Sequence, residues 1–208
     1  MTKNRELCNF KLTFLGSLLG LILSSSQAFS FSKHCRYDFL PKESTLQWTA
    51  FKTNEKLPVK GKFIQYKLNQ ASFPSLKDFL TDVKMDIDSA QIDTANPARD
   101  TTITHAFFLK MTSPTIKVST QDIQGEKTGQ LNMVLSLNGK SHKVPMEFTM
   151  EEDSLTLTGG FDFLKFDMIE PLKSLNEVCF DLHKGKDGIS KTWSEVELLF
   201  VGKFKKQC

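Results

Sequence analysis

The 208 residues of this chain are enough for one domain, and 27 Lys and Arg against 24 Asp and Glu give a formal net charge of +3. Lys3, Arg5, Lys11 and Glu6 lie at the extreme N terminus, and without them the charge is only +1. The charge therefore gives no reason to expect a nucleic-acid partner.

The N-terminal segment has the pattern of a signal peptide. The basic start, with Lys3 and Arg5, precedes an apolar run from Leu12 to Leu23 that is too short to cross a bilayer comfortably. Small residues before Ala28 favour cleavage after that residue, with Ser30 as the second choice; an uncleaved anchor is the alternative. We therefore predict a signal peptide over 1–28, a single domain over 29–208, and a periplasmic or secreted protein.

Apolar and polar residues alternate almost everywhere after this segment. Val83, Met85 and Ile87 alternate with charged neighbours, and Asn138-Gly139 separates two alternating runs. Alternation with period two indicates antiparallel strands, and Asn-Gly is a strong hairpin signal. Such even spacing favours a sandwich or an up-and-down barrel, all-β in either case. The predicted strands lie near 35–40, 44–53, 59–68, 82–91, 114–121, 129–138, 141–150 and 154–163, with a further pair near 174–183 and 192–205.

The stretch ANPARDTTITHAFFLK, from Ala95 to Lys110, breaks this alternation. Asn96 can cap a helix, and Pro97 suits a first helical turn because the missing N–H is not needed there. We predict a short helix near 97–109 that ends in Phe107 and Phe108 and lies over one end of the sheet.

No motif for catalysis or metal binding is found. Gly-x-Ser-x-Gly is absent, and the four histidines do not have the spacing of metal ligands. We therefore predict a non-enzymatic protein without a metal or cofactor, with His183 in solvent. The unusual feature is 18 Phe against two Tyr, which fits either plain core packing or a barrel lumen that holds an apolar ligand.

Four stretches in order resemble the YceI-like family of exported, lipocalin-like polyisoprenoid-binding proteins, and the lysine-rich first and last stretches resemble a subgroup of it. They are LQWTAFKTNEKLPVKGKF (46–63), DSAQIDTANPARDTTITHAFF (88–108), LSLNGKSHKVPMEF (135–148) and DLHKGKDGISKTWSEVEL (181–198).

The resemblance implies an antiparallel, lipocalin-like β-barrel of about eight strands whose apolar lumen holds a long-chain isoprenoid or similar fatty-acid-like lipid. It also implies that the helix lines or closes one mouth, and that Arg99 and Asp100 either fix the helix entry or contact a ligand head group. The alternative is a secreted barrel with a closed, ligand-free lumen that acts by surface protein–protein interaction; a homodimer stays open. The expected ligand-binding residues are Phe51, Phe63, Met85, Phe107, Phe108, Met133, Leu135, Met146, Phe148, Phe163, Phe180 and Phe200.

Three cysteines follow the predicted signal peptide: Cys35, Cys179 and Cys208. In an up-and-down barrel the first and last strands pair antiparallel, which brings the start of one beside the end of the other. Cys35 opens the first predicted strand and Cys208 ends the last, whereas Cys179 falls inside the penultimate one. We predict a Cys35–Cys208 disulfide and a free, partly buried Cys179.

Overall fold

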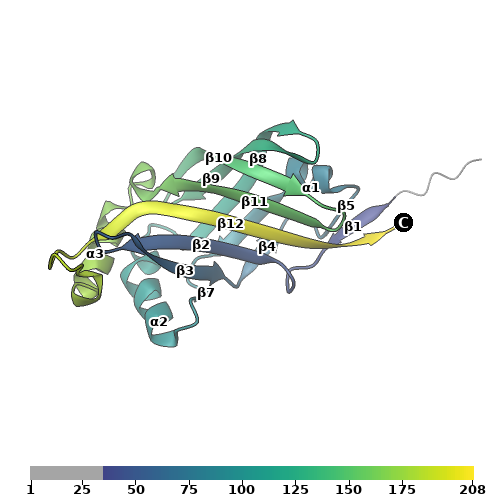
Figure 1. Ribbon diagram of the computed structural model, residues 1–208. Coiled ribbons are helices and arrows are strands. Elements are labelled where there is room, and N and C mark those ends of the chain that lie inside the picture. Colours follow the sequence, from purple (N-terminus) through teal and green to yellow (C-terminus); the bar gives the residue numbers. More distant parts are fainter. Residues whose placement is uncertain (1–34) are drawn as a thin grey trace, which may run out of the picture. The chain divides into compact units, whose positions relative to one another are not determined.

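The computed structural model describes residues 35–208, so the predicted signal peptide lies outside the described residues (Figure 1). The domain is mostly β, as predicted, with short helices between the strands. The strands are β1 (Arg36–Phe39), β2 (Thr45–Lys52), β3 (Leu57–Phe63), β4 (Tyr66–Leu68), β5 (Ser72–Phe73), β6 (Lys84–Asp88), β7 (Ile92–Asp93), β8 (Thr115–Gly125), β9 (Thr128–Leu137), β10 (Lys140–Met150), β11 (Ser154–Asp162) and β12 (Thr192–Gln207). The α-helices are α1 (Leu76–Asp82), α2 (Pro97–Ala106) and α3 (Ile169–Val178), and the 3-10 helices are η1 (Phe108–Lys110), η2 (Phe163–Phe166) and η3 (Asp181–His183).

The strands form one antiparallel sheet that curls into a barrel. Its order is β4-β6-β8-β9-β10-β11-β12-β2-β3-β7, with β1 beside β12 and β5 beside β1. The predicted run 59–68 is broken into β3 and β4, whereas 82–91 holds only β6, and β7 follows it at Ile92–Asp93. Backbone N–H groups of Ile64 and Asp88 donate across these breaks to the carbonyls of Gln91 and Gln65, each at 3.0 Å. β4 and β7 are the two ends of the strand order, and these bonds bring the β3–β4 segment beside the β6–β7 segment, which closes the barrel.

The first and last strands pair as predicted, although they do not close the barrel, because the ends of the sheet meet between the β3–β4 and β6–β7 runs. β1 runs antiparallel to the end of β12, with Arg36 opposite Gln207 and Phe39 opposite Phe204. Cys35 and Cys208, one residue beyond this ladder, form a disulfide. Cys179 is a free, buried thiol, but the strand predicted around it is wrong, because it lies just after helix α3.

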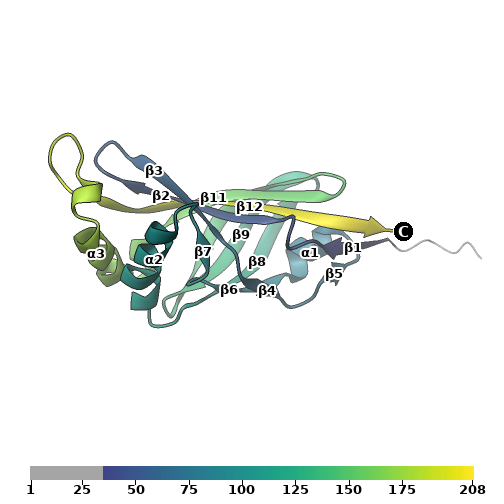
Figure 2. The same ribbon diagram turned by 90° about the horizontal axis from the view of Figure 1, so that it is seen from below.

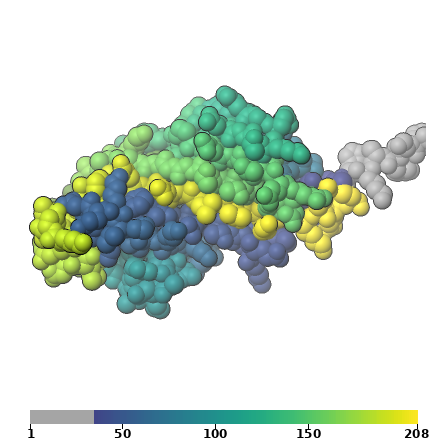
Figure 3. Space-filling view, viewed as in Figure 1, coloured from purple at the N-terminus to yellow at the C-terminus, as the bar shows by residue number. Residues whose placement is uncertain are grey.

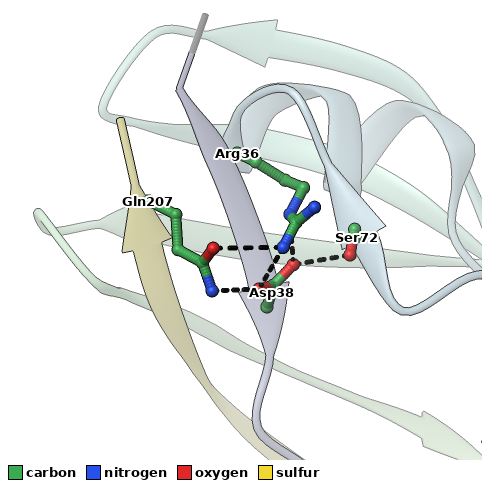
Figure 4. Close-up of polar contacts among 4 residues, drawn as sticks. All are labelled: Arg36, Asp38, Ser72 and Gln207. Atoms are coloured by element: carbon green, nitrogen blue, oxygen red, sulfur yellow. Dashed lines mark hydrogen bonds and ion pairs between the residues drawn. The ribbon is translucent and has the colours of Figure 1, made fainter.

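A polar cluster holds β1 between β12 and β5 (Figure 4). The Arg36 guanidinium lies 2.8 Å from the Asp38 carboxylate and also donates to the Gln207 side-chain carbonyl at 3.1 Å. Asp38 accepts further hydrogen bonds from Ser72 and Gln207. The bond from Ser72, followed by that from Arg36, lowers the pKa of Asp38, so this carboxylate stays ionised and keeps the strands in register.

Phenylalanine rings fill the end of the barrel next to this cluster. The rings of Phe39 and Phe79 each lie with centroids 5.0–6.2 Å from those of Phe200 and Phe204 and 5.8 Å from each other, and we call these four rings the plug. They come from β1, α1 and β12, and Phe73 of β5 packs behind them, 5.0 Å from Phe79. All five are buried. Figure 2 shows β1, β5 and α1 gathered at this end. Because the five buried rings occupy it, the barrel is filled here by its own side chains.

Helices α2 and α3 lie together at the other end of the barrel (Figures 1 and 2). The predicted helix near 97–109 is α2 followed by η1, and the side chain of Asn96 caps it by accepting from the N–H of Arg99. The predicted strand at 174–183 is instead the end of α3 followed by η3. The apolar residues Leu172, Leu175 and Val178 of α3 recur at every third position, which is helical spacing rather than strand alternation.

Helix α1 was not predicted, although its start carries a clear signal. Ser75 is the N-cap: its hydroxyl oxygen accepts a hydrogen bond from the backbone N–H of Asp78, and the hydroxyl donates to the Asp78 carboxylate. Phe79 and Leu80 then bury the inner face of the helix against the barrel. Within residues 35–208, no helix combines the length and apolar character needed to cross a membrane.

The disulfide ties the ends of the domain together, so its loss should lower stability. It closes a loop of sequence separation 173, which on the chain-entropy model is worth about 4–5 kcal/mol. We expect the Cys35→Ser, Cys208→Ser double variant to lose up to this amount of unfolding free energy, measured by denaturant titration. Reductant should destabilise the wild-type protein by the same amount as the double substitution does, and should leave the double variant unchanged. If reductant also destabilised the double variant, this account would be contradicted.

Candidate functional site

The α2–α3 end of the barrel is hollow. A cavity of about 440 Å³ lies among β2, β3, β8, β9, β12 and the two helices. Its wall is mainly apolar and aromatic, which is typical of pockets that hold small apolar ligands. The aromatic residues that line it are Trp48, Phe51, Phe63, Phe107, Phe108, Phe161, Phe163 and Trp193.

The structure divides the twelve predicted ligand-binding residues into two groups and one exception. Seven line the cavity: Phe51, Phe63, Phe107, Phe108, Met133, Leu135 and Phe163. Four are buried in the filled half of the barrel and do not line it: Met85, Met146, Phe148 and Phe200. Phe180 follows α3 and is half exposed outside the cavity, so its predicted inward orientation is wrong because the strand that was expected to carry it does not exist.

The plug marks the floor of the cavity. Phe200 is paired with Leu46 across β12 and β2 and lies two residues from Leu198 on the same face of its strand. Leu46 and Leu198 line the cavity, whereas Phe200 stacks on Phe39 and Phe79. The boundary is equally sharp on β6, where Ile87 lines the cavity and Met85 does not. The cavity is therefore blind at this end.

A bare glycine lets the largest ring of the wall lie flat. A Cβ atom on Gly61 of β3 would lie 2.2 Å from the Trp48 ring, so only glycine fits beneath it. The indole is buried, and its N–H finds no hydrogen-bond acceptor among the described residues. An unpaired buried donor is costly, which makes this position a candidate contact for a ligand oxygen.

Polar groups gather at the end of the cavity near η3, where sequence reasoning had placed nothing. His183, predicted to lie in solvent, is buried and lines the cavity with Lys52, Cys179 and Thr192. The missed signal was the four-residue spacing of Cys179 and His183, which places both on one side of a helical turn. No comparable pattern connects them with Lys52, which comes from the distant strand β2.

Hydrogen bonds fix the tautomer of His183. The Thr192 hydroxyl donates to the Asn176 side-chain carbonyl at 2.9 Å, so it must accept from Nδ1–H of His183, 2.7 Å away. Nε2 of the neutral ring is then an acceptor. Burial, with a smaller effect from the Lys52 charge, lowers the pKa of His183, so the ring is neutral at pH 7.

The charged side chains that line the cavity are cationic. Burial raises the pKa of the Cys179 thiol, which therefore stays protonated, whereas Lys52 and Arg99 carry positive charge. The Lys52 ammonium donates one hydrogen bond to the Leu182 carbonyl, at 3.1 Å, and has two further protons. No Asp or Glu among residues 35–208 lines the cavity, so its polar end favours a ligand group that is anionic or accepts hydrogen bonds.

Arg99 and Asp100 both bind Thr94, the buried residue just before α2. The Asp100 carboxylate accepts the Thr94 N–H at 2.9 Å, and Arg99 Nε donates to the Thr94 hydroxyl at 2.9 Å. These bonds fix the start of α2, which is one of the two roles that the resemblance implied. Arg99 also lines the cavity and Asp100 does not.

The mouth of the cavity is marked by the lining residues that are exposed. Asn96, Ala98 and Arg99 come from the start of α2, and Leu182 comes from η3. A ligand whose tail occupies the blind end would have its head among Lys52, His183 and Arg99, close to this opening.

The family model of the YceI-like domain matches residues 37–201. The chain belongs to this YceI-like family. No match is found among curated proteins.

Solved structures of similar fold include a polyisoprenoid binding domain from Saccharophagus degradans and BcnA from Burkholderia cenocepacia. The first has 10% sequence identity and a TM-score of 0.59, over 82% of this chain and 98% of that one. The second has 16% identity and a TM-score of 0.54, over 82% of this chain and all of that one. At this identity the likeness shows the fold alone, a YceI-like antiparallel barrel.

Neutral His183 makes stability depend on pH. Its pKa is below the ordinary 6.5 in the folded protein, so the unfolded chain takes up more protons as the pH falls through 6.5. We expect the unfolding free energy to fall as the pH drops below about 6.5. The share of this loss that comes from protonation of His183 should be absent in His183→Asn, whose side chain can still donate to Thr192. Parallel pH profiles for the two proteins in denaturant titrations would contradict the assignment.

Proposed function

We propose that the protein binds a single-chain amphiphilic lipid, an isoprenoid or a fatty-acid-like molecule, without catalysis. The observation that carries this proposal is the blind, mainly apolar cavity whose charged groups, Lys52 and Arg99, lie near its mouth. The family supports it, since one solved relative is a polyisoprenoid binding domain. A closed, ligand-free lumen would offer no such cavity, so the cavity favours ligand binding over the surface-interaction alternative.

The volume of the cavity sets the size of the tail. A methylene takes about the room of one water molecule in the liquid, about 30 Å³, so about 440 Å³ holds about 15 carbons. At about 0.8 kcal/mol per buried methylene, such a tail gains about 12 kcal/mol before the cost of ordering it. This gain is sufficient for stable binding without any strong polar contact.

The head group would lie among Lys52, Arg99 and His183. Two cations and a neutral imidazole acceptor suit a head that carries a carboxylate, a phosphate or a carbonyl together with a hydroxyl. Export to the periplasm or the medium belongs to the same proposal and is supported by the N-terminal pattern and by the disulfide, a bond that persists in oxidising compartments.

The first test fills the cavity. Leu135 and Val134 are neighbours on β9, but only Leu135 lines the cavity. We expect Leu135→Trp to weaken binding of farnesol or palmitate at least tenfold, measured by displacement of a fluorescent probe, at a stability cost of about 1–3 kcal/mol. Val134→Trp, on the outer face, is the matched control. Binding that is equally strong in both variants would exclude this cavity, and native mass spectrometry of the purified protein would identify any retained lipid.

The second test measures the floor. In a series of straight-chain fatty acids, affinity should rise by up to about 0.8 kcal/mol per methylene and level off near 15 carbons. Phe200→Ala should move this limit upward by about four carbons, since the deleted ring leaves a cavity of comparable size. Phe73→Ala removes the same ring one layer behind the plug and should leave the limit unchanged. If Phe200→Ala and the wild-type protein level off at the same chain length, the plug does not set the length of the bound tail.

A further inference from the structure

Exposed apolar side chains gather beside the cavity mouth. We call residues 52–57 and 178–191 the tip. Five large hydrophobic side chains of the tip are about half exposed or more: Leu57, Val178, Phe180, Leu182 and Ile189. The other strongly exposed large hydrophobics of residues 35–208 lie elsewhere, at Ile64, Leu109, Leu164 and Ile169. A cluster of exposed apolar residues marks an interaction site more often than single ones do.

The two segments of the tip are joined by hydrogen bonds. The Thr53 N–H donates to the Lys191 carbonyl at 2.9 Å, and the Lys186 N–H donates to the Glu55 carboxylate at 3.2 Å. The side chain of Asn54 also donates to Asp187. Figure 3 shows segment 178–191, in yellow-green, and the β2–β3 turn, in dark blue, as one continuous surface at the left end of the view. The apolar side chains are therefore carried by one connected platform.

The tip is also positively charged. It contains Lys52, Lys56, Lys184, Lys186 and Lys191 against Glu55, Asp181 and Asp187. The three acids are engaged within the tip: Asp181 pairs with Lys184 at 2.7 Å, Asp187 accepts the Ile189 N–H at 2.9 Å, and Glu55 accepts from Lys186. The ammonium groups of Lys186 and Lys191 form no ion pair within residues 35–208. Lys191 instead lies over the Trp193 ring, 3.5 Å from its centroid.

Leu182 connects the tip to the cavity. It is the most exposed of the five apolar side chains, and it also lines the cavity at its mouth. A lipid tail that left the cavity into water would lose about fourfold in equilibrium constant per methylene, the equivalent of about 0.8 kcal/mol. A tail that passed along Leu182 into an apolar phase would avoid this loss.

We propose that the tip docks on the surface of a membrane that contains anionic lipids. Exposed Phe, Leu, Ile and Val insert at the headgroup boundary, and the surrounding lysines meet the negative surface charge. The cavity mouth would then face the bilayer, so that a lipid could enter or leave without crossing water. This transfer step rests on the proposed function, whereas the binding of the tip to a membrane does not.

The test uses vesicles of phosphatidylcholine, with and without phosphatidylglycerol, in co-sedimentation with the purified full-length domain. We expect binding to the anionic vesicles to be at least tenfold tighter than to the neutral ones, and to weaken with salt. Phe180→Ser with Ile189→Ser should weaken it at least tenfold. These side chains are 49% and 57% exposed, and neither lines the cavity, so tail binding in solution should be unchanged.

Two matched controls separate docking from general surface effects. Ile64→Ser with Leu164→Ser removes side chains that are 59% and 50% exposed but lie outside the tip, and should leave vesicle binding intact. Lys186→Gln should weaken binding to anionic vesicles, whereas Lys117→Gln, on the outer face of β8, should not.

Three results would overturn the proposal. They are equal binding to both kinds of vesicle, equal loss in the tip and control variants, and a concentration-dependent dimer that the tip variant abolishes without any vesicle binding. The last would make the tip an interface between two copies of the chain. Failure of tail binding in solution with intact vesicle docking would instead refute the proposed function and leave the docking surface standing.

Discussion

Phenylalanine rings packed across one end of the barrel hold the strands together there and form the floor of the cavity. A barrel of this width can be filled by side chains or can hold one small ligand. Here the half beside α1 is filled, and the half beside α2 and α3 is hollow. Phe39, Phe79, Phe200 and Phe204 fill one half and support the strands around it. The other half can remain hollow because its stability does not depend on its own core alone.

The plug in turn depends on contacts between the ends of the chain. Phe39 comes from β1, a strand of four residues that is too short to be stable by itself. It is held against β12 by the ladder, by the Arg36–Asp38–Gln207 cluster and by the disulfide one residue beyond. The covalent bond is therefore coupled to the floor of a cavity that lies on the far side of the plug.

The charged groups of the cavity, Lys52 and Arg99, lie at the open end for a related reason. A polar group deep among phenylalanine rings would lose its hydrogen bonds to water, and a charge would lose still more. Near η3, by contrast, His183 hydrogen-bonds to Thr192 and Lys52 donates to the Leu182 carbonyl, while Arg99 donates to Thr94 at the start of α2. The cavity is thus amphipathic along its length, and the exposed apolar residues of the tip continue its wall to the outside.

Much of this arrangement follows from the sequence by itself. Strand alternation and the Asn138-Gly139 hairpin are local regularities that led to an all-β fold, and the resemblance to the YceI-like family then favoured a barrel over a sandwich. The break in alternation after Asn96 and Pro97 led to α2, and the pairing of first and last strands in a barrel led to the Cys35–Cys208 pair. Alternation also identifies which residues face inward, because a one-residue shift would turn the whole apolar set outward. Met85, Met146 and Phe148 are buried for this reason.

Alternation does not distinguish the inward residues that surround the cavity from those that fill the core; that distinction depends on packing between distant segments. Phe107 and Phe200 carry the same side chain, yet one lines the cavity and the other belongs to the plug, because neighbours distant in sequence occupy the space beside Phe200. His183 and Phe180 show the same limit. A helix replaces the expected strand, turning the histidine inward beside Lys52 and the phenylalanine outward, since packing against the barrel rather than local alternation determines the conformation there.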